Sequence, residues 1–106
     1  MKSYNVAIVG ATGAVGEVLL ELLGERRFPV GYLYLLASER SAGSTMSFGG
    51  KRLTVQNLAD FDFSNVHIAL FSAGGDISAE YAPKAAAAGC IVIDNTSHFR
   101  REDAIP

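Results

Sequence analysis

Three glycines recur at every third position early in the chain, as Gly10, Gly13 and Gly16 within GATGAVG. Glycine at the first position allows a sharp reversal, at the second a close approach to a phosphate, and at the third tight packing of a helix on a strand. No acidic residue lies between Gly10 and Gly16, so unpaired helix N–H groups remain available to an external anion. The pattern favours binding of a diphosphate, although the commonest dinucleotide fingerprint has a different glycine spacing. A purely structural turn is the alternative.

The segments on either side of these glycines are suited to hold them in place. The run from Tyr4 to Val9 is short, apolar and rich in β-branched residues, which predicts a buried strand. The segment from Glu17 to Gly24 carries leucine and valine at helical spacing, and Gly24 can supply a left-handed stop. A strand, a glycine turn and a helix in this order form the opening unit of a dinucleotide-binding fold.

Further strands are predicted at 32–37, 66–71 and 91–93, each apolar and bounded by turn residues. Gly49-Gly50 lies between two short runs, 45–48 and 51–55, and predicts a hairpin that we expect at the sheet edge rather than in the parallel core. The fold class is therefore α/β: a Rossmann-like, doubly wound, mostly parallel sheet with helices on both faces and an edge hairpin. The segment between Asn57 and Asn65 is polar and turn-rich.

A second helix is predicted from Ser78 to Ala88. Ser78 or Asp76 can cap its start, Pro83 falls near the first turn, and Gly89 ends it. Its alanines favour the helix and allow it to pack closely on the sheet.

Four polar clusters follow directly after predicted strands, at Gly10–Gly16, Ser38–Ser41, Ser72–Gly75 and Asp94–Arg100. The carboxyl ends of parallel strands share one edge of the sheet, and open α/β sheets bind their ligands at that edge. One extended ligand is therefore expected to contact all four clusters.

The cluster after the second strand distinguishes between nicotinamide cofactors. Glu39 would suit the ribose 2′-hydroxyl of NAD, whereas Arg40 would suit the 2′-phosphate of NADP. Ser38 and Ser41 add two hydroxyls beside the guanidinium, so NADP is the favoured cofactor. The alternative is a solvated loop in which Glu39 and Arg40 pair weakly.

The last two clusters offer small or polar side chains to the rest of a ligand. Ser72 and Gly74 are expected near a ribose or nicotinamide, unless they form a plain turn before the next helix. Asn95 and its neighbours supply neutral hydrogen-bonding groups, and Arg100 is expected to hold an anionic substrate. Arg100 could instead belong to a charged surface run.

No residue of the chain is predicted to be catalytic. Cys90 precedes a strand, away from the ligand edge, and is expected to be structural. Asp94 is expected to be a cap or a hydrogen-bond acceptor rather than a base, and His67 is expected to be structural. His98 has no visible partner and receives no role.

Composition bounds the remaining possibilities. The 106 residues suit one domain, and a net charge of −2 without a basic stripe argues against a nucleic-acid partner. One cysteine indicates a reducing cytoplasm, and no apolar run is long enough for a membrane span. No metal site is predicted. The chain stops at Pro106, soon after the fourth main strand, and we expect an N-terminal fragment of a longer protein.

The quoted motifs together resemble a known enzyme family. GATGAVG, LASERSAG (36–43), FSAGGDISAEYAP (71–83) and DNTSHFR (94–100) are similar, in register, to aspartate-semialdehyde dehydrogenases of the bacterial type. The resemblance covers nearly the whole chain and implies the N-terminal part of an NADP-binding domain. These enzymes make aspartate semialdehyde from aspartyl 4-phosphate by reductive dephosphorylation, in the biosynthesis of lysine, threonine and methionine.

The resemblance also implies roles for individual residues. The NADP diphosphate would lie on the segment Thr12, Gly13, Ala14 and Val15, and the 2′-phosphate on Arg40 and Ser41. The cofactor ribose would lie near Ser72 and Gly74, the substrate pocket near Asn95, and a substrate phosphate on Arg100.

The nucleophilic cysteine and the histidine base lie beyond Pro106 in the family pattern, so this chain alone is expected to be inactive. A homo-oligomer is implied for the longer protein, together with an acyl phosphate or semialdehyde and phosphate as its small-molecule partners. The alternatives are N-acetyl-γ-glutamyl-phosphate reductase, a non-catalytic NADP-sensing module, or a Rossmann-like domain without a ligand.

Overall fold

The computed structural model describes residues 3–72 and 75–94. Within these residues it contains two α-helices and six strands, with two short 3₁₀ turns before the third main strand. In chain order the elements are β1 (Tyr4–Val9), α1 (Ala14–Glu25), β2 (Val30–Ala37), β3 (Thr45–Phe48), β4 (Lys51–Asn57), the 3₁₀ turns Leu58–Asp60 and Phe63–Asn65, β5 (Ile68–Phe71), α2 (Gly75–Ala87) and β6 (Ile91–Asp94).

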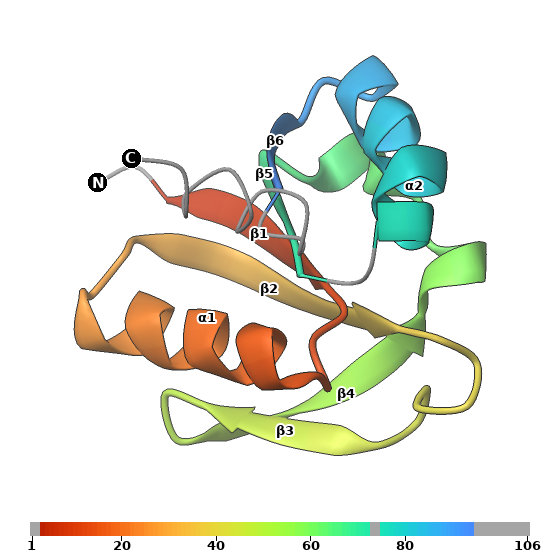
Figure 1. Ribbon diagram of the computed structural model, residues 1–106. Helices are drawn as coiled ribbons and strands as arrows, with labels where there is room; N and C mark the ends of the chain where they lie inside the picture. The colour runs from red at the N-terminus through yellow and green to blue at the C-terminus, as the bar shows by residue number, and fades with distance from the viewer. Residues whose placement is uncertain (1–2, 73–74, 95–106) are drawn as a thin grey trace, which may run out of the picture.

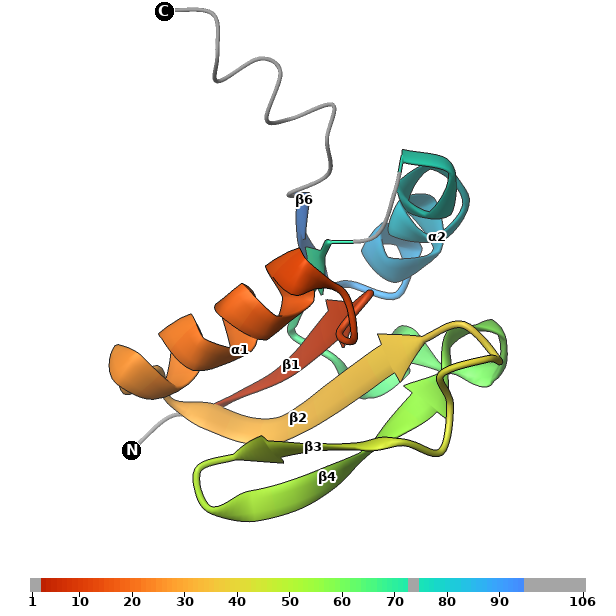
Figure 2. The ribbon, with the colours of Figure 1, turned by 60° about the horizontal axis from the view of Figure 1, so that its bottom comes forward.

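The strands form one sheet in the order β3-β4-β2-β1-β5-β6. β1 lies in the interior and pairs in parallel with β2 on one side and with β5 on the other, and β6 continues the sheet in parallel. Figure 2 shows the arrowheads of β1, β2 and β4 pointing the same way and that of β3 pointing back. The carboxyl ends of five strands therefore meet at one edge, which confirms the Rossmann-like class.

The hairpin differs from its prediction in one respect. Gly49 and Gly50 both have positive φ, 58° and 83°, as a tight turn between β3 and β4 requires. However, β4 also pairs in parallel with β2, from Leu35 to Ala37, so only β3 is an antiparallel addition at the edge. The expectation that the whole hairpin lies outside the parallel core was wrong.

Alternate residues of β1 point to the two faces of the sheet, and each face carries one helix (Figure 1). Val6 and Ile8 pack in a cluster with Leu20 of α1, whereas Ala7 and Val9 pack in another with Ala85 of α2. The β1 members are no more than 1% exposed, so this strand is the centre of the core. Its burial on both faces explains why its sequence is an unbroken apolar run.

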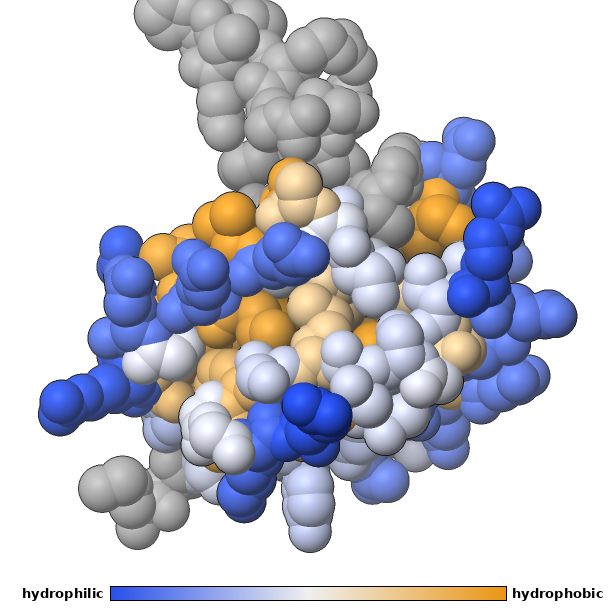
Figure 3. Space-filling view, turned by 90° about the horizontal axis from the view of Figure 1, so that it is seen from below, coloured by the Kyte–Doolittle hydropathy of each residue, from blue (hydrophilic) through white to orange (hydrophobic). Residues whose placement is uncertain are grey.

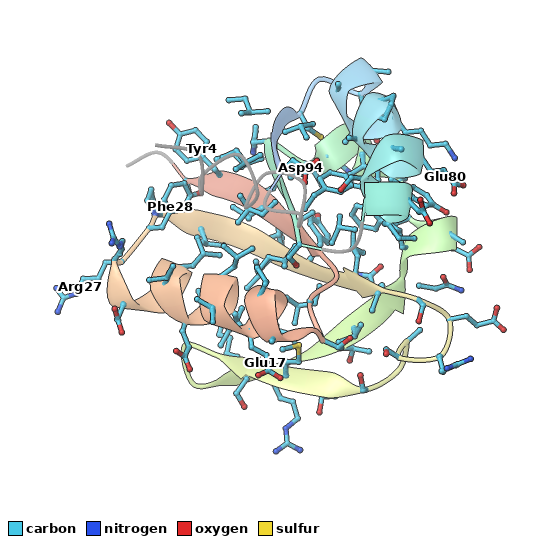
Figure 4. The ribbon with its side chains drawn as sticks, in the orientation of Figure 1. Tyr4, Glu17, Arg27, Phe28, Glu80 and Asp94 are labelled. Carbon is cyan, nitrogen blue, oxygen red and sulfur yellow. The ribbon has the colours of Figure 1, made fainter. Side chains whose placement is uncertain are left out.

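Helix α1 extends further than predicted at both ends, and Gly24 does not stop it. The left-handed position falls instead on Arg27, with φ 52°, the only described residue other than glycine with positive φ. The Arg27 N–H donates to the Gly24 carbonyl at 3.2 Å and the Phe28 N–H to the Leu23 carbonyl at 3.1 Å, a Schellman motif. Arg27 points away from the molecule, where its side chain is exposed (Figure 4).

Helix α2 starts at Gly75, so the prediction of a cap at Ser78 or Asp76 was wrong. Ser78 is inside the helix and buried, and Pro83 lies in the helix interior rather than near its first turn. Gly89 ends the helix with φ 98°, as predicted. The Cys90 N–H then donates to the Ala85 carbonyl at 3.1 Å, which closes the turn.

Asn5 joins three segments at the amino end of the sheet, where the pairing of β1 with β2 is irregular. Its side-chain oxygen accepts from the Tyr32 N–H at 3.0 Å, and its side-chain nitrogen donates to the Asn65 carbonyl at 2.8 Å. The Asn5 backbone N–H donates to Nδ1 of His67 at 2.8 Å, so His67 is part of the same structural network.

Apolar side chains remain visible on the side of the molecule that carries α1, between polar ones (Figure 3). Val18 and Leu22 of α1 are 53% and 37% exposed. On β6, Ile91 and Ile93 are 64% and 44% exposed. Neither described helix combines the length and apolar character that crossing a membrane would require.

Candidate functional site at the carboxyl edge of the sheet

The turn after β1 is held by backbone hydrogen bonds to the neighbouring strand. Gly10 has φ 87°, a conformation that glycine adopts without strain. The N–H groups of Gly10 and Ala11 both donate to the Leu36 carbonyl of β2, at 2.8 and 3.1 Å. The Gly10 carbonyl in turn accepts from the Gly13 N–H at 3.1 Å. The glycine turn is therefore held by hydrogen bonds from the chain's own backbone.

Helix α1 presents its amino end at this turn. Gly13 occupies the cap position and makes no side-chain cap bond, and the Glu17 N–H donates to its carbonyl at 3.0 Å. The preceding N–H groups, those of Ala14, Val15 and Gly16, have no acceptor among the described residues. Together with the helix dipole they favour an anion at this position, with an effect of about 0.3–1 kcal/mol from the dipole.

Gly16 sets the distance between α1 and the turn. A Cβ at this position would lie 2.3 Å from the Gly10 carbonyl oxygen and 2.7 Å from that of Ala11. Both are backbone atoms, so only glycine allows this close contact. At Gly13 a Cβ would have its nearest neighbour at 3.6 Å, the same Gly10 oxygen, and the residue is exposed.

The loop after β2 lies beside the glycine turn. The Ser41 N–H and the Ala42 N–H both donate to the Ser38 carbonyl at 3.0 Å, which orders the loop. The Thr12 and Ser41 hydroxyl oxygens are 3.5 Å apart, at the outer limit for a hydrogen bond. The structure thus brings together two groups of residues expected to bind the cofactor.

Arg40 lies in the same loop with its side chain exposed. Within the described residues no ion pair joins it to Glu39, so the weak pairing considered as an alternative does not occur there. The guanidinium is therefore available to a ligand that also contacts Ser38 and Ser41.

Ser72 follows β5 and contacts the glycine turn directly. Its hydroxyl donates toward the carbonyl oxygens of Val9 and Gly10, at 2.9 and 3.2 Å, and its N–H donates to Val9 at 2.9 Å. Three of the four predicted clusters therefore converge at the carboxyl edge of β1, β2 and β5.

Asp94 at the end of β6 pairs in register with Phe71, next to Ser72. Its carboxylate accepts a hydrogen bond from the Ser78 hydroxyl of α2 at 3.3 Å, as expected of an acceptor at a strand end. Figure 4 labels Asp94. Gly74, Asn95 and Arg100, the other expected site residues, lie outside the described residues.

A cavity of about 160 Å³ opens between these loops and α2. Val9, Gly10, Thr12 and Ser38 line one part of it, as members of the predicted site or its neighbours. The sequence analysis did not select the remaining lining residues, which are apolar: Ala37, Leu58 and Ile77. Leu58 lies in a segment that its polar composition marked only as turns, and no sequence signal distinguishes it.

Features away from this edge carry no predicted binding residue. A hollow of about 380 Å³ lies between the start of β2 and the hairpin, lined by Tyr32, Phe48, Lys51 and their neighbours.

Cys90 is 9% exposed, and its thiol donates to the Val66 carbonyl at 3.2 Å. Burial raises the pKa of this thiol, which disfavours the nucleophilic thiolate form. No group of potential metal ligands gathers within residues 3–72 and 75–94.

Comparisons with known proteins identify the family to which this chain is related. A family model described as "Semialdehyde dehydrogenase, NAD binding domain" matches residues 5–106. Aspartate-semialdehyde dehydrogenase 2 of Vibrio cholerae is 65% identical over 99% of the chain, and the Legionella pneumophila aspartate-semialdehyde dehydrogenase is 66% identical over the same share. The chain covers 31% and 30% of these two proteins.

A solved structure gives the same result for the fold. Aspartate semialdehyde dehydrogenase II from Vibrio cholerae, complexed with ASA, is 67% identical and superposes with a TM-score of 0.89. The match covers 93% of this chain and 32% of that one. The chain thus spans about a third of the length of its relatives, and it belongs to the semialdehyde dehydrogenase family, whose NAD-binding domain it matches.

Proposed function

We propose that this chain binds NADP along the carboxyl edge of its sheet. The single observation that carries the proposal is the convergence of the glycine turn, the loop 38–44 and Ser72 at that edge, where the turn and Ser38 also line a cavity. The diphosphate would bind the free N–H groups at the start of α1, beside Thr12 and Gly13. The adenosine would lie against the apolar lining supplied by Ala37, Leu58 and Ile77.

The choice of NADP over NAD depends on Arg40 and its neighbours. In this proposal the Arg40 guanidinium and the hydroxyls of Ser38 and Ser41 bind the 2′-phosphate. Charge-assisted hydrogen bonds of this kind contribute about 1.5–3 kcal/mol, which corresponds to a preference of about tenfold or more. Glu39, in the same loop, would be the acceptor for the 2′-hydroxyl of NAD, which has no 2′-phosphate for Arg40 to bind.

We further propose that the chain is the cofactor-binding part of an aspartate-semialdehyde dehydrogenase. The names and the 65–66% identity of the relatives support this activity. Bound NADPH would supply a hydride for the reduction of an acyl group derived from aspartyl 4-phosphate. Asn95 and Arg100 would line the substrate pocket and hold the phosphate. In line with the resemblance, we expect a homo-oligomer in the cytoplasm.

The chain itself is proposed to contribute no nucleophile. A thiol attacks as the thiolate, and the burial of Cys90 disfavours that form. Its sulfur also lies next to the Val66 and Phe63 carbonyls, before β5, rather than at the ligand edge. Residues 1–106 are therefore expected to show no dehydrogenase turnover, and Cys90→Ser is expected to change nothing in such an assay.

Calorimetric titration with NADP and NAD tests the cofactor proposal. The protein is expected to bind NADP at least about tenfold more tightly, and Arg40→Ala is expected to remove the difference. Arg52→Ala is the matched control, because Arg52 is also an exposed arginine but lies on the hairpin. Equal affinities of the unmodified protein for the two cofactors would refute the assignment of this loop.

Assays of the full-length protein with aspartate semialdehyde and with N-acetyl-glutamate semialdehyde test the activity. Turnover of the first is expected. Activity on the acetylated substrate alone would assign the chain to the sister reductase instead.

A further inference from the structure

The Ser72 hydroxyl has no proton left to donate to a cofactor. A serine hydroxyl carries one hydrogen, and the two acceptors within reach are the carbonyl oxygens of Val9 and Gly10, at 2.9 and 3.2 Å. The side chain is only partly exposed and bridges from the end of β5 to the end of β1. Its proton is therefore directed at the glycine turn, and a ligand could bond to this oxygen only by donating to its lone pairs.

The Gly10 carbonyl is the point at which the contacts of this turn meet. It accepts from the Gly13 N–H at 3.1 Å as well as from Ser72, and Gly16 packs so closely on it that a Cβ would lie 2.3 Å away. The N–H on the other side of the same peptide unit, that of Ala11, donates to Leu36 at 3.1 Å. The peptide between Gly10 and Ala11 is thus held at both its carbonyl and its N–H.

The residue before this peptide bond does not fix its own backbone conformation. Glycine reaches left-handed and right-handed backbone conformations at similar cost, so the φ of 87° at Gly10 is not fixed by the residue itself. A different orientation of the Gly10 carbonyl would break its bond with Gly13 and alter how the start of α1 faces the ligand. A hydrogen bond from outside the turn opposes that change.

Building on the proposed function, we propose that Ser72 is a positioning residue for the phosphate-binding turn and not a contact for the cofactor ribose. It orients the Gly10 carbonyl, and through it the N–H groups that receive the diphosphate. This differs from the role near the ribose that the family resemblance implies. A contact with the ribose would affect only ligands that carry that ribose, whereas a positioning role would affect every ligand that carries the diphosphate.

The test compares Ser72→Ala with the unmodified protein for two ligands. NADP carries the nicotinamide ribose, whereas 2′-phospho-ADP carries the diphosphate but lacks that ribose. If Ser72 is a positioning residue, the loss of one neutral hydrogen bond is expected to lower the affinity for both ligands equally, by about three- to tenfold. A positioning role also predicts faster hydrogen exchange at the Gly13 amide in the absence of ligand.

Ser78→Ala is the matched control, because it also removes a serine hydroxyl from a hydrogen bond. That bond joins Ser78 of α2 to Asp94 of β6 and does not involve the glycine turn. Ser78→Ala is expected to leave both affinities and the Gly13 exchange unchanged. If Ser72→Ala does not fold, Ser72→Cys replaces it as a weaker donor, with a smaller loss in the same pattern.

A lower affinity for NADP alone would show that Ser72 directly contacts the nicotinamide half of the cofactor, and it would overturn the inference. Unchanged affinities for both ligands would overturn it as well. If the unmodified protein binds neither ligand, the proposed function fails. The exchange rate at Gly13 would then still decide whether Ser72 holds the turn.

Discussion

Replacing Gly16 with alanine is expected to destabilise the protein, although alanine is the better helix former. Gly16 lies in the first turn of α1, directly against the preceding glycine turn. The added methyl would be 2.3 Å from the Gly10 carbonyl oxygen, 2.7 Å from that of Ala11 and 2.8 Å from the Ala11 carbonyl carbon. These are backbone atoms, so no side-chain rotation can relieve the contact.

Two opposing terms set the magnitude. Alanine is favoured over glycine within a helix by about 0.8–1.0 kcal/mol. Forcing a methylene-sized group into a well-packed site costs about 1–3 kcal/mol, and the contact with fixed backbone places Gly16 toward the upper part of that range. The net loss is therefore expected to be about 1–2 kcal/mol of the free energy of unfolding. For a domain of this size that lowers Tm by about 4–16 °C.

Gly24→Ala provides the control in the same helix. A Cβ there would meet only the side chain of Phe48, at 3.8 Å, an ordinary van der Waals distance. This variant is expected to gain up to about 1 kcal/mol. Urea unfolding of both variants, followed by far-UV circular dichroism, measures the difference. A Gly16→Ala variant as stable as Gly24→Ala would refute the close packing of α1 on the turn.

The remaining predictions concern the carboxyl end of α1, the amino end of the sheet and the thiol of Cys90. Arg27→Gly is expected to raise the free energy of unfolding by up to about 1 kcal/mol, because glycine reaches the left-handed conformation at C′ without strain; a lower Tm would contradict this. Asn5→Ala removes the bonds to Tyr32 and Asn65 and is expected to cost about 1–3 kcal/mol in the same urea assay; an unchanged midpoint would contradict it. Cys90 is expected to react with a thiol reagent only as fast as the protein opens. Because burial raises its pKa, its contribution to stability is complete below the ordinary pKa of a thiol and is lost as the pH rises through the raised value. A rapid reaction of Cys90 with the reagent in the folded protein would contradict this. So would a free energy of unfolding that does not change as the pH rises through the alkaline range.

The main parallel strands and the edge at which their loops meet could be predicted from the sequence. Short apolar runs followed at once by glycine and serine clusters identify parallel strands and their carboxyl ends, because both depend on local composition. Gly89 was also correctly predicted as a helix end, since a glycine after an alanine run is a strong local signal. The juxtaposition of Thr12 with Ser41 follows from that topology.

Features that depend on distant contacts could not be predicted. At the end of α1 the Phe28 N–H bonds back to Leu23 and the Phe28 side chain packs against the core, and Arg27 takes the conformation that Gly24 was expected to take. The pairing of β4 with β2 is non-local, whereas the Gly49-Gly50 signal reports only the hairpin. The direction of the Ser72 hydroxyl is likewise a property of the folded turn.

The most direct test of the central claim is a titration of the ¹⁵N-labelled protein with NADP, followed by the amide NMR signals. The account predicts that the signals of Thr12, Ala14 and Ser41 shift together at the carboxyl edge of the sheet. Those of Tyr32 and Lys51, at the larger hollow, should stay unchanged. Shifts confined to that hollow, or none at the start of α1, would contradict the proposal that a dinucleotide binds where these loops converge.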